Sequence, residues 1–503
     1  MSTFKKLLSQ TALYGLSSII GRSMNFLLVP FYTSVMQPGR YGIVTEFYAY
    51  VAFFNILYTF GMETAYFRYA NKDQADEKNV YSIIQSFITI LGILFTLTLI
   101  FFSSSISESM GYSGKPQYVI WLACVMFIDA FVAIPFARLR FKNRVQFFVI
   151  IKLINILLNI CFNIFFLVVC AQIHQGKYLS FLQPLINIFY DSSRQVEFVF
   201  MSNLLANLIF VPMLIIPLTN GWRFSLRYTE IKPYFNYAYP IMIMGIAGMI
   251  NEMLSRAMLK YVLPDGFYGS ITKLEALGIF GACYKLSMFM TLAVQSFRYA
   301  AEPFFFSKAA DKNAPDLFAK VMKWFVIFCS AIYLVVSVNL DFFGLLLRKE
   351  IYRTGLGVVP LLLLANLFLG IYYNLSVWYK LSDRTQFGAY ISLLGACITI
   401  VLNLLFIPIA GYMGAAFATL VCYFTMCAMS YYYGNKYYPI QYPLGSIFFY
   451  IALATIIIFI LSNIYVSFIL KCILSVSSVV FYGICVWIFE RDELNTILKK
   501  KSF

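Results

Sequence analysis

Five positively charged side chains fall inside stretches of sequence that otherwise predict membrane-spanning helices: Arg22, Lys152, Arg256, Lys285 and Arg298. On insertion scales, a lysine or arginine at the centre of a bilayer costs roughly 2.5 to 3.5 kcal/mol. Such residues therefore usually face a bundle interior, a water-filled cavity or a charged ligand. The chemistry that they suggest is the binding of an anionic cargo within the membrane.

The composition indicates that long apolar helices hold these charges. Of the 503 residues, 61% are hydrophobic and 12% are charged, and the mean hydropathy is +0.77. A soluble globular protein carries about 25% charged residues. We therefore expect an all-α polytopic membrane protein with no separate soluble domain.

Apolar stretches long enough to cross a bilayer recur along the chain and predict about fourteen transmembrane helices. The expected spans are residues 11–36, 41–67, 80–104, 117–138, 146–171, 196–219, 238–264, 275–304, 319–343, 356–380, 386–409, 411–433, 444–465 and 467–489. The first span is longer than the apolar core of a signal peptide, so we interpret it as a helix of the mature protein.

The distribution of Lys and Arg predicts the orientation, because cytoplasmic loops retain positive charge. Basic residues concentrate in the loops that an inside amino terminus would make cytoplasmic, including Arg138, Arg140, Lys142 and the tail Lys499–Lys501. Both termini are therefore expected in the cytoplasm. Topology and contact with membrane lipids explain the net charge of +16, and we expect no nucleic-acid partner.

The chain contains two copies of one pattern. Arg22-Ser-Met with Pro30 returns as Arg256-Ala-Met with Pro264, and Tyr41-Gly42-Ile43 returns as Leu277-Gly278-Ile279. Arg144, Gln146, Phe147, Asn163 and Phe166 likewise match Arg384, Gln386, Phe387, Asn403 and Phe406. We predict two pseudo-symmetric six-helix lobes, 1–219 and 238–433, joined by a cytoplasmic linker at 220–237 and followed by an extra helix pair and tail at 434–503.

Cofactor, metal and catalytic chemistry find little support in the sequence. The ten cysteines lie inside expected spans without a CxxC pair, and the single histidine, His174, lies in an outer loop. Cysteines of this kind pack as small apolar side chains. We expect no cofactor, no metal site and no catalytic residues.

Two segments near the amino terminus resemble the opening of a known family. They are GLSSIIGRSMNFLLVPFY from Gly15 to Tyr32 and YGIVTEFY from Tyr41 to Tyr48. The pattern is similar to that of bacterial Wzx-like polysaccharide flippases, members of the multidrug/oligosaccharidyl-lipid/polysaccharide (MOP) exporter superfamily. The likeness in topology covers essentially the whole chain.

The resemblance implies a transporter, not an enzyme, in the bacterial cytoplasmic (inner) membrane. Its cargo would be an oligosaccharide linked to a polyprenyl pyrophosphate, moved to the outer leaflet by alternating access. Polysaccharide polymerase and chain-length proteins would be further partners. The family's cationic cavity maps onto Arg22, Arg256 and Lys285, and guanidinium offers a planar fork suited to phosphate.

The remaining intramembrane charges have structural interpretations beside functional ones. Lys152 lies about two turns into its span, where it either contacts cargo or extends to the interface. Glu252 lies four residues before Arg256, which suits an ion pair on one helix. Asp129, central in its span, either carries a coupling proton or cation or pairs with Arg22 or Lys285. Glu46 and Glu63 are expected at opposite membrane interfaces.

Three alternative functions are compatible with parts of the sequence. A cation-coupled drug exporter of the same superfamily should present acidic groups in its first lobe, whereas span 1 of this chain has Arg22 and no carboxylate. A lipid II flippase would share the cationic cavity and the pyrophosphate carrier. A membrane polysaccharide polymerase or ligase would need a catalytic outer loop, and residues 172–195 show no clear acid/base constellation.

Overall fold

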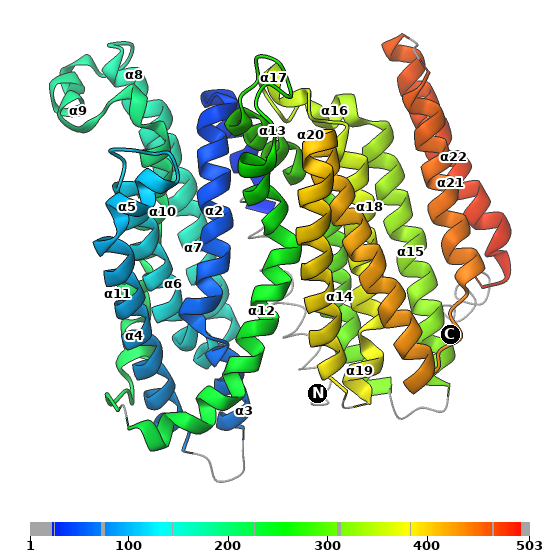
Figure 1. Cartoon of the computed structure of the whole chain (residues 1–503), viewed down its shortest axis with the longest axis horizontal. Coiled ribbons are helices and arrows are strands. Elements are labelled where there is room, and N and C mark those ends of the chain that lie inside the picture. The colour runs from blue at the N-terminus through cyan, green and yellow to red at the C-terminus, as the bar shows by residue number, and fades with distance from the viewer. Residues whose placement is uncertain are drawn as a thin grey trace. The chain divides into compact units, whose positions relative to one another are not determined.

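The computed structural model describes residues 23–24, 26–71, 76–142, 144–225, 227–308, 313–382, 384–464 and 467–493. Over these residues the protein is helical, and an isolated bridge between Tyr268 and Ile271 is the sole β pairing (Figure 1). The predicted all-α fold is confirmed. The contacts divide the chain into two compact units, Met1–Gly281 and Ala282–Phe503.

The first unit holds the helices from α2 to α12 and most of α13. Their bounds are α2 Pro38–Thr59, α3 Met62–Ala70, α4 Glu77–Phe101, α5 Ser103–Ser109, α6 Gln117–Phe141, α7 Val145–Ile164, α8 Cys170–His174, α9 Gln183–Phe189, α10 Gln195–Leu208, α11 Phe210–Thr219, α12 Tyr228–Val262 and α13 Lys273–Leu286. Helix α4 packs on α6, α10 packs on α6 and α7, and α12 runs beside α2 (Figure 1). This unit therefore gathers the first expected lobe and the helix that follows the expected linker.

The second unit holds the end of α13 and the helices from α14 onward. Their bounds are α14 Met288–Lys308, α15 Ala314–Val338, α16 Leu340–Gly344, α17 Glu350–Arg353, α18 Val358–Leu375, α19 Val377–Leu381, α20 Gln386–Tyr437, α21 Leu444–Ser462 and α22 Phe468–Phe489. Helix α18 packs on α20 and on α15, and the pair α21 and α22 packs on α15.

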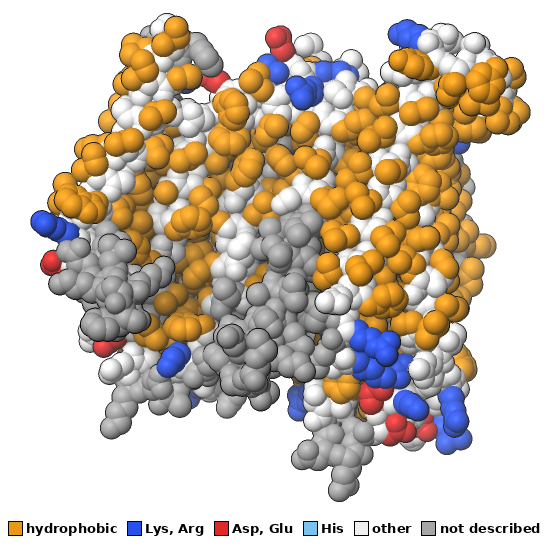
Figure 2. All heavy atoms as spheres, turned by 180° about the vertical axis from the view of Figure 1, so that it is seen from behind, with side chains coloured by type: hydrophobic (Ala, Val, Ile, Leu, Met, Phe, Trp, Pro, Cys, Tyr) orange, Lys and Arg blue, Asp and Glu red, His pale blue; other side chains and the backbone are white. Residues whose placement is uncertain are grey.

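Eleven described helices are long and apolar enough to cross a membrane, or twelve if one bent pair counts as a single span. Each expected span from residue 41 onward overlaps a described helix. The expected span 11–36 lies mostly outside the described residues, and its end is a short apolar helix at Phe26–Val35. Hydrophobic side chains cover the length of the helices, and charged ones gather toward the helix ends (Figure 2). The number fourteen and the orientation stay predictions.

Helix α20 accounts for two expected spans. It has 52 residues, which at 1.5 Å per residue gives roughly 78 Å, more than twice the apolar thickness of a bilayer. Gly411 interrupts it with φ 56° and ψ −133°, a conformation that glycine adopts without a clash from a Cβ. The expected spans 386–409 and 411–433 therefore meet at this kink.

The repeat is visible in matching local geometry in the two units. Asn163 and Asn403 are both fully buried, and each donates to the carbonyl one turn earlier, Asn159 at 2.8 Å and Thr399 at 2.7 Å. The turns after α6 and α19 also match. Their bonds are Lys142 N to Arg138 O (2.9 Å), Arg144 N to Leu139 O (2.9 Å), Ser382 N to Trp378 O (3.0 Å) and Arg384 N to Tyr379 O (2.8 Å).

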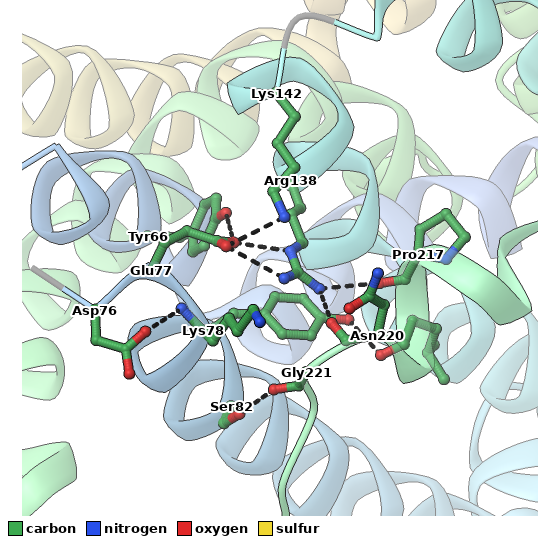
Figure 3. Close-up of polar contacts among 12 residues, drawn as sticks. Tyr66, Asp76, Glu77, Lys78, Ser82, Arg138, Lys142, Pro217, Asn220 and Gly221 are labelled. Atoms are coloured by element: carbon green, nitrogen blue, oxygen red, sulfur yellow. Dashed lines mark hydrogen bonds and ion pairs between the residues drawn. The ribbon is translucent and has the colours of Figure 1, made fainter.

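Arg138 on α6 binds three parts of the first unit together (Figure 3). Its Nε and Nη2 donate to the two carboxylate oxygens of Glu77 at 2.7 and 3.2 Å. Its Nη1 donates to the carbonyls of Pro217, at 3.2 Å, and Asn220. The guanidinium also lies 4.2 Å from the ring centroid of Tyr81. The side chain is 3% exposed, so its fork is satisfied inside the protein.

The segment after α11 lies along α4. The Ser82 hydroxyl donates to the Gly221 carbonyl at 2.9 Å and accepts from the Arg223 N–H at 3.0 Å. The Trp222 indole donates to the Ser86 hydroxyl at 3.2 Å. Part of the expected linker 220–237 is thus held on the first unit, and α12 already begins at Tyr228.

A second buried charge cluster joins the carboxyl-terminal helix pair to α15. Lys323 Nζ lies 2.6 Å from Glu490 Oε2 and 2.9 Å from Glu493 Oε1. The Tyr450 hydroxyl of α21 donates to Glu490 at 3.1 Å. Lys323 and Glu490 are both buried. This cluster fixes α21 and the end of α22 to the second unit.

We predict that Arg138→Met lowers stability, because it removes the buried donors to the Glu77 carboxylate and to the carbonyls of Pro217 and Asn220. Glu77 keeps its ion pair with Lys142 at 3.2 Å, so we expect a loss of about 1 to 3 kcal/mol, the cost of leaving buried polar groups unsatisfied. The thermal midpoint of the purified protein should fall, and Glu77→Gln with Arg138→Met should recover part of the loss. Arg227→Ala is the control, because Arg227 is 80% exposed and 3.7 Å from Glu230. An Arg138→Met midpoint equal to that of the control would contradict the role given to Arg138.

Candidate functional site

The predicted cationic residues of the repeat are described for the second copy only. Arg22 lies outside the described residues. Arg256 lies in the last third of α12, is 8% exposed, and directs Nη1 to the Met253 sulfur at 3.1 Å. Glu252 lies one turn earlier on the same helix and is partly buried. A guanidinium is therefore held in the interior of the first unit.

Lys285 lies at a break between two helices. Helices α13 and α14 meet at a 45° bend, and the hydroxyl of Ser287 at this bend donates to the Tyr284 carbonyl at 2.7 Å. Such back-bonding by serine often bends a helix. Lys285 lies two residues before Ser287 of the bend and is exposed.

Asp129 and Lys152 lie in one polar cluster within the first unit. Asp129 is at the middle of α6 and accepts a hydrogen bond from Asn207 of α10 at 3.0 Å. The Asp129 carboxylate also lies within electrostatic range of the Lys152 ammonium group of α7. Lys152 Nζ lies 4.3 and 4.9 Å from the ring centroids of Phe136 and Phe210. Cation–π contacts of this kind stabilise an ammonium group away from water.

Asparagine and tyrosine side chains extend this cluster, and sequence reasoning missed them. Asn155 donates to the Asn207 oxygen at 2.9 Å, and Asn203 donates to the Tyr48 hydroxyl at 2.8 Å. These residues come from α2, α7 and α10. Asparagines four residues apart in an apolar stretch, such as Asn203 and Asn207, are the sequence signal that would have indicated a polar helix face.

A separate polar contact lies where span 1 ends. The Tyr32 hydroxyl donates to the Asn163 oxygen at 2.9 Å, and Asn163 donates to the Asn159 side chain at 3.0 Å. Both Tyr32 and Asn163 are buried. The described end of span 1 is thus joined to α7 by hydrogen bonds, as buried polar groups require.

Glu46 of α2 is fully buried and paired, although an interface position was expected. Lys260 of α12 lies 2.9 Å from each carboxylate oxygen, and the hydroxyls of Tyr112 and Tyr261 donate to the same carboxylate at 2.5 and 2.9 Å. Burial and the nearby Glu46 raise the pKa of Tyr112 well above its usual range, so it remains a donor. The partner of Glu46 lies 214 residues away, beyond any local pattern.

The second unit contains a cavity of about 1020 Å³ beside the Lys323 cluster. Most of its lining is apolar, and charged residues form part of one side. The lining residues are Ala293, Ser296 and Phe297 of α14, Leu317, Lys320, Val321, Trp324, Phe325 and Phe328 of α15, and Asp492 and Glu493 after α22. A volume of this size accommodates a long hydrocarbon chain.

The described residues of the first unit hold the buried guanidinium of Arg256, and those of the second unit hold the Lys323 cluster and an apolar cavity. The described residues of both units include no group of three His, Cys, Asp or Glu side chains placed to hold a metal ion. His174 contacts Asn187 at 2.7 Å through Nδ1.

The sequence matches a known protein family over more than half of its length. The family described as "Polysaccharide biosynthesis protein" matches residues 7–308. No curated protein sequence matches the chain significantly.

Comparison of the fold with solved structures gives transporters. A lipid II flippase, MurJ, in an inward closed conformation superposes with a TM-score of 0.68 at 14% identity, covering 96% of this chain and 99% of that chain. An inward-facing multidrug resistance MATE family transporter of the MOP superfamily superposes with a TM-score of 0.63 at 12% identity, covering 85% and 97%. An outward-facing MATE structure gives 0.55 at 12% identity, covering 92% and 97%.

We predict that Asp129 and Lys152 are energetically coupled. A double-mutant cycle with Asp129→Asn and Lys152→Met should give a coupling free energy of about 0.5 to 3 kcal/mol in thermal unfolding, the range for residues that share a network. Additive effects of the two substitutions would show that the charges do not interact. Lys471→Met with Asp129→Asn provides the additive control, since Lys471 pairs with Asp341 in the other unit.

Proposed function

We propose that this chain, which belongs to the polysaccharide biosynthesis protein family, is a lipid-linked oligosaccharide flippase. Its fold is that of MOP-superfamily transporters, which supports the proposal. The cargo is an oligosaccharide on a polyprenyl pyrophosphate, carried from the cytoplasmic to the outer leaflet of a bacterial inner membrane. Alternating access moves it, and surface polysaccharide synthesis uses it.

The buried guanidinium of Arg256 is the observation that carries this proposal. An arginine within apolar helices is costly and marks a functional site by default. A pyrophosphate that leaves the headgroup layer needs charge-assisted donors, and guanidinium binds phosphate oxygens in pairs. In the proposal, Arg22 supplies the equivalent group in the first copy of the repeat, and the exposed Lys285 adds a third positive charge.

The cavity in the second unit supports the lipid part of the cargo. Its wall is formed largely by Phe297, Val321, Phe325 and Phe328, and Lys320 lies on its charged side. An apolar chain gains about 0.8 kcal/mol for each CH₂ group that it buries. In the proposal, the polyprenyl chain occupies this cavity or the bilayer beside it while the headgroup crosses.

Asp129 and Lys152 are proposed to respond to the cargo or to a coupling ion. Lys152 lies within electrostatic range of Asp129, so a phosphate that attracts Lys152 would weaken the attraction between these two charges. The carboxylate would then be available to a proton or a cation. Glu252, one turn from Arg256, is the second carboxylate proposed to act in this way.

Lipid II is the alternative cargo that the fold comparison favours, because a lipid II flippase superposes over nearly the whole chain. The family match to polysaccharide biosynthesis weighs toward a different headgroup. A cationic drug is disfavoured, because Arg256 and Lys285 would repel it. A polymerase and chain-length proteins, which would consume the product, are the proposed protein partners.

The proposal predicts a specific defect in cells that lack the protein. Surface polysaccharide should be lost and the lipid-linked oligosaccharide should accumulate in the inner leaflet. Wild-type protein should restore export, whereas Arg256→Ala should reduce it by about 10- to 100-fold, as expected for loss of a charge-assisted bond worth about 1.5 to 3 kcal/mol.

Immunoblots of the membrane fraction check that each variant is present. Lys273→Ala is the matched control, because Lys273 pairs at the surface with Asp265, which is 93% exposed. Normal export by Arg256→Ala would remove Arg256 from the site. Accumulation of a peptidoglycan precursor instead of a polysaccharide precursor would support lipid II as the cargo.

A further inference from the structure

Two glycines related by the repeat occupy one helix crossing. Gly42 lies in α2 and Gly278 in α13, at matching positions in Tyr41-Gly42-Ile43 and Leu277-Gly278-Ile279. A Cβ added at Gly42 would lie 2.1 Å from the Leu274 carbonyl oxygen. A Cβ added at Gly278 would lie 2.0 Å from the Pro38 carbonyl oxygen. No side chain fits at either position.

The two contacts are reciprocal. Gly42 meets the residue one turn before Gly278, and Gly278 meets the residue one turn before Gly42. The crossing therefore has local two-fold symmetry, which the repeat predicts for equivalent helices that meet at their symmetry axis. Because the obstacles are backbone atoms, no change of rotamer relieves the clash. Small residues permit this close approach of helices in membranes.

Further contacts at the same end of α2 hold this helix against α12 and α13. A Cβ added at Gly281 would lie 2.7 Å from the Thr45 side chain. One turn after Gly42, the fully buried Glu46 binds Lys260 of α12 at 2.9 Å. Lys260 also donates to the Met110 carbonyl, in the loop before α6, at 2.7 Å. Glycine packing and a buried ion pair thus seal one end of α2 against α12 and α13.

We propose that this crossing is the closed outer gate of the transport cycle, and that Gly42 and Gly278 are positioning residues that let it seal. The inference rests on the proposed function, since only a carrier with alternating access needs such a gate. The predicted orientation places the start of α2 at the outer face. Opening toward that face would separate Gly42 from Gly278 and break the contact of Glu46 with Lys260.

The test uses Thr45→Cys as a probe in the full chain, labelled in intact cells by a membrane-impermeant maleimide. Labelling above that of the unsubstituted chain reports access to the crossing from outside. Adding Gly42→Ala or Gly278→Ala should raise the labelling rate about tenfold or more, because overpacking against backbone disfavours the sealed state. Export should fall in both variants. Gly248→Ala is the matched control, because a Cβ there meets nothing within 4 Å.

Unchanged labelling in both glycine variants would overturn the proposal, as would labelling from the cytoplasmic side alone. If neither glycine variant reaches the membrane, Glu46→Gln, which adds no bulk, gives the same readout, and unchanged labelling there overturns it equally. Labelling needs no cargo. A gate that responds as expected in a protein that exports no oligosaccharide would therefore contradict the proposed function and leave the gate intact.

Discussion

A carboxylate buried among apolar helices needs a positive partner, and this requirement organises the protein. The fully buried or nearly buried carboxylates among the described residues are Glu46, Glu197 and Glu490. Each meets a lysine from a distant part of the chain: Lys260, Lys115 and Lys323, respectively. Because removing one member leaves the other uncompensated, these pairs fix which helices are neighbours. They join α2 to α12, the loop before α6 to α10, and α15 to the end of α22.

The need of buried charges for partners also distinguishes the two buried arginines, Arg138 and Arg256. Arg138 is buried and uses its donors on Glu77 and on two carbonyls, so it is a structural residue. At the matching position of the repeat, the chain has Trp378, which is also buried and donates to Ser430 at 3.2 Å. The buried side chain at this turn is therefore a charged arginine in the first copy of the repeat and an aromatic tryptophan in the second. Arg256 directs Nη1 to the Met253 sulfur at 3.1 Å, and in the proposed function its guanidinium binds the pyrophosphate.

Much of the fold could be predicted from the sequence, because hydropathy and length determine where helices cross a membrane. Expected spans such as 444–465 and 467–489 coincide with α21 and α22, and the repeat is visible in the matching bonds of Asn163 and Asn403. The partners of individual side chains could not be predicted. Glu46 was expected at an interface, and its burial against Lys260 depends on how α2 and α12 are rotated, which no local pattern records.

The candidate site also contains residues that could be predicted from the sequence and residues that could not. Lys152, Asp129 and Arg256 were identified from their charge at membrane depth, but Asn207 and Asn155 carry no such signal. In the proposed function, the protein moves a lipid pyrophosphate across the membrane. Leaflet translocation can be measured in proteoliposomes that contain a polyprenyl-pyrophosphate oligosaccharide, through the access of a sugar-modifying enzyme from outside. We expect protein-dependent translocation that weakens when the pyrophosphate is replaced by an uncharged linkage. Equal rates with and without the protein would contradict the proposed function.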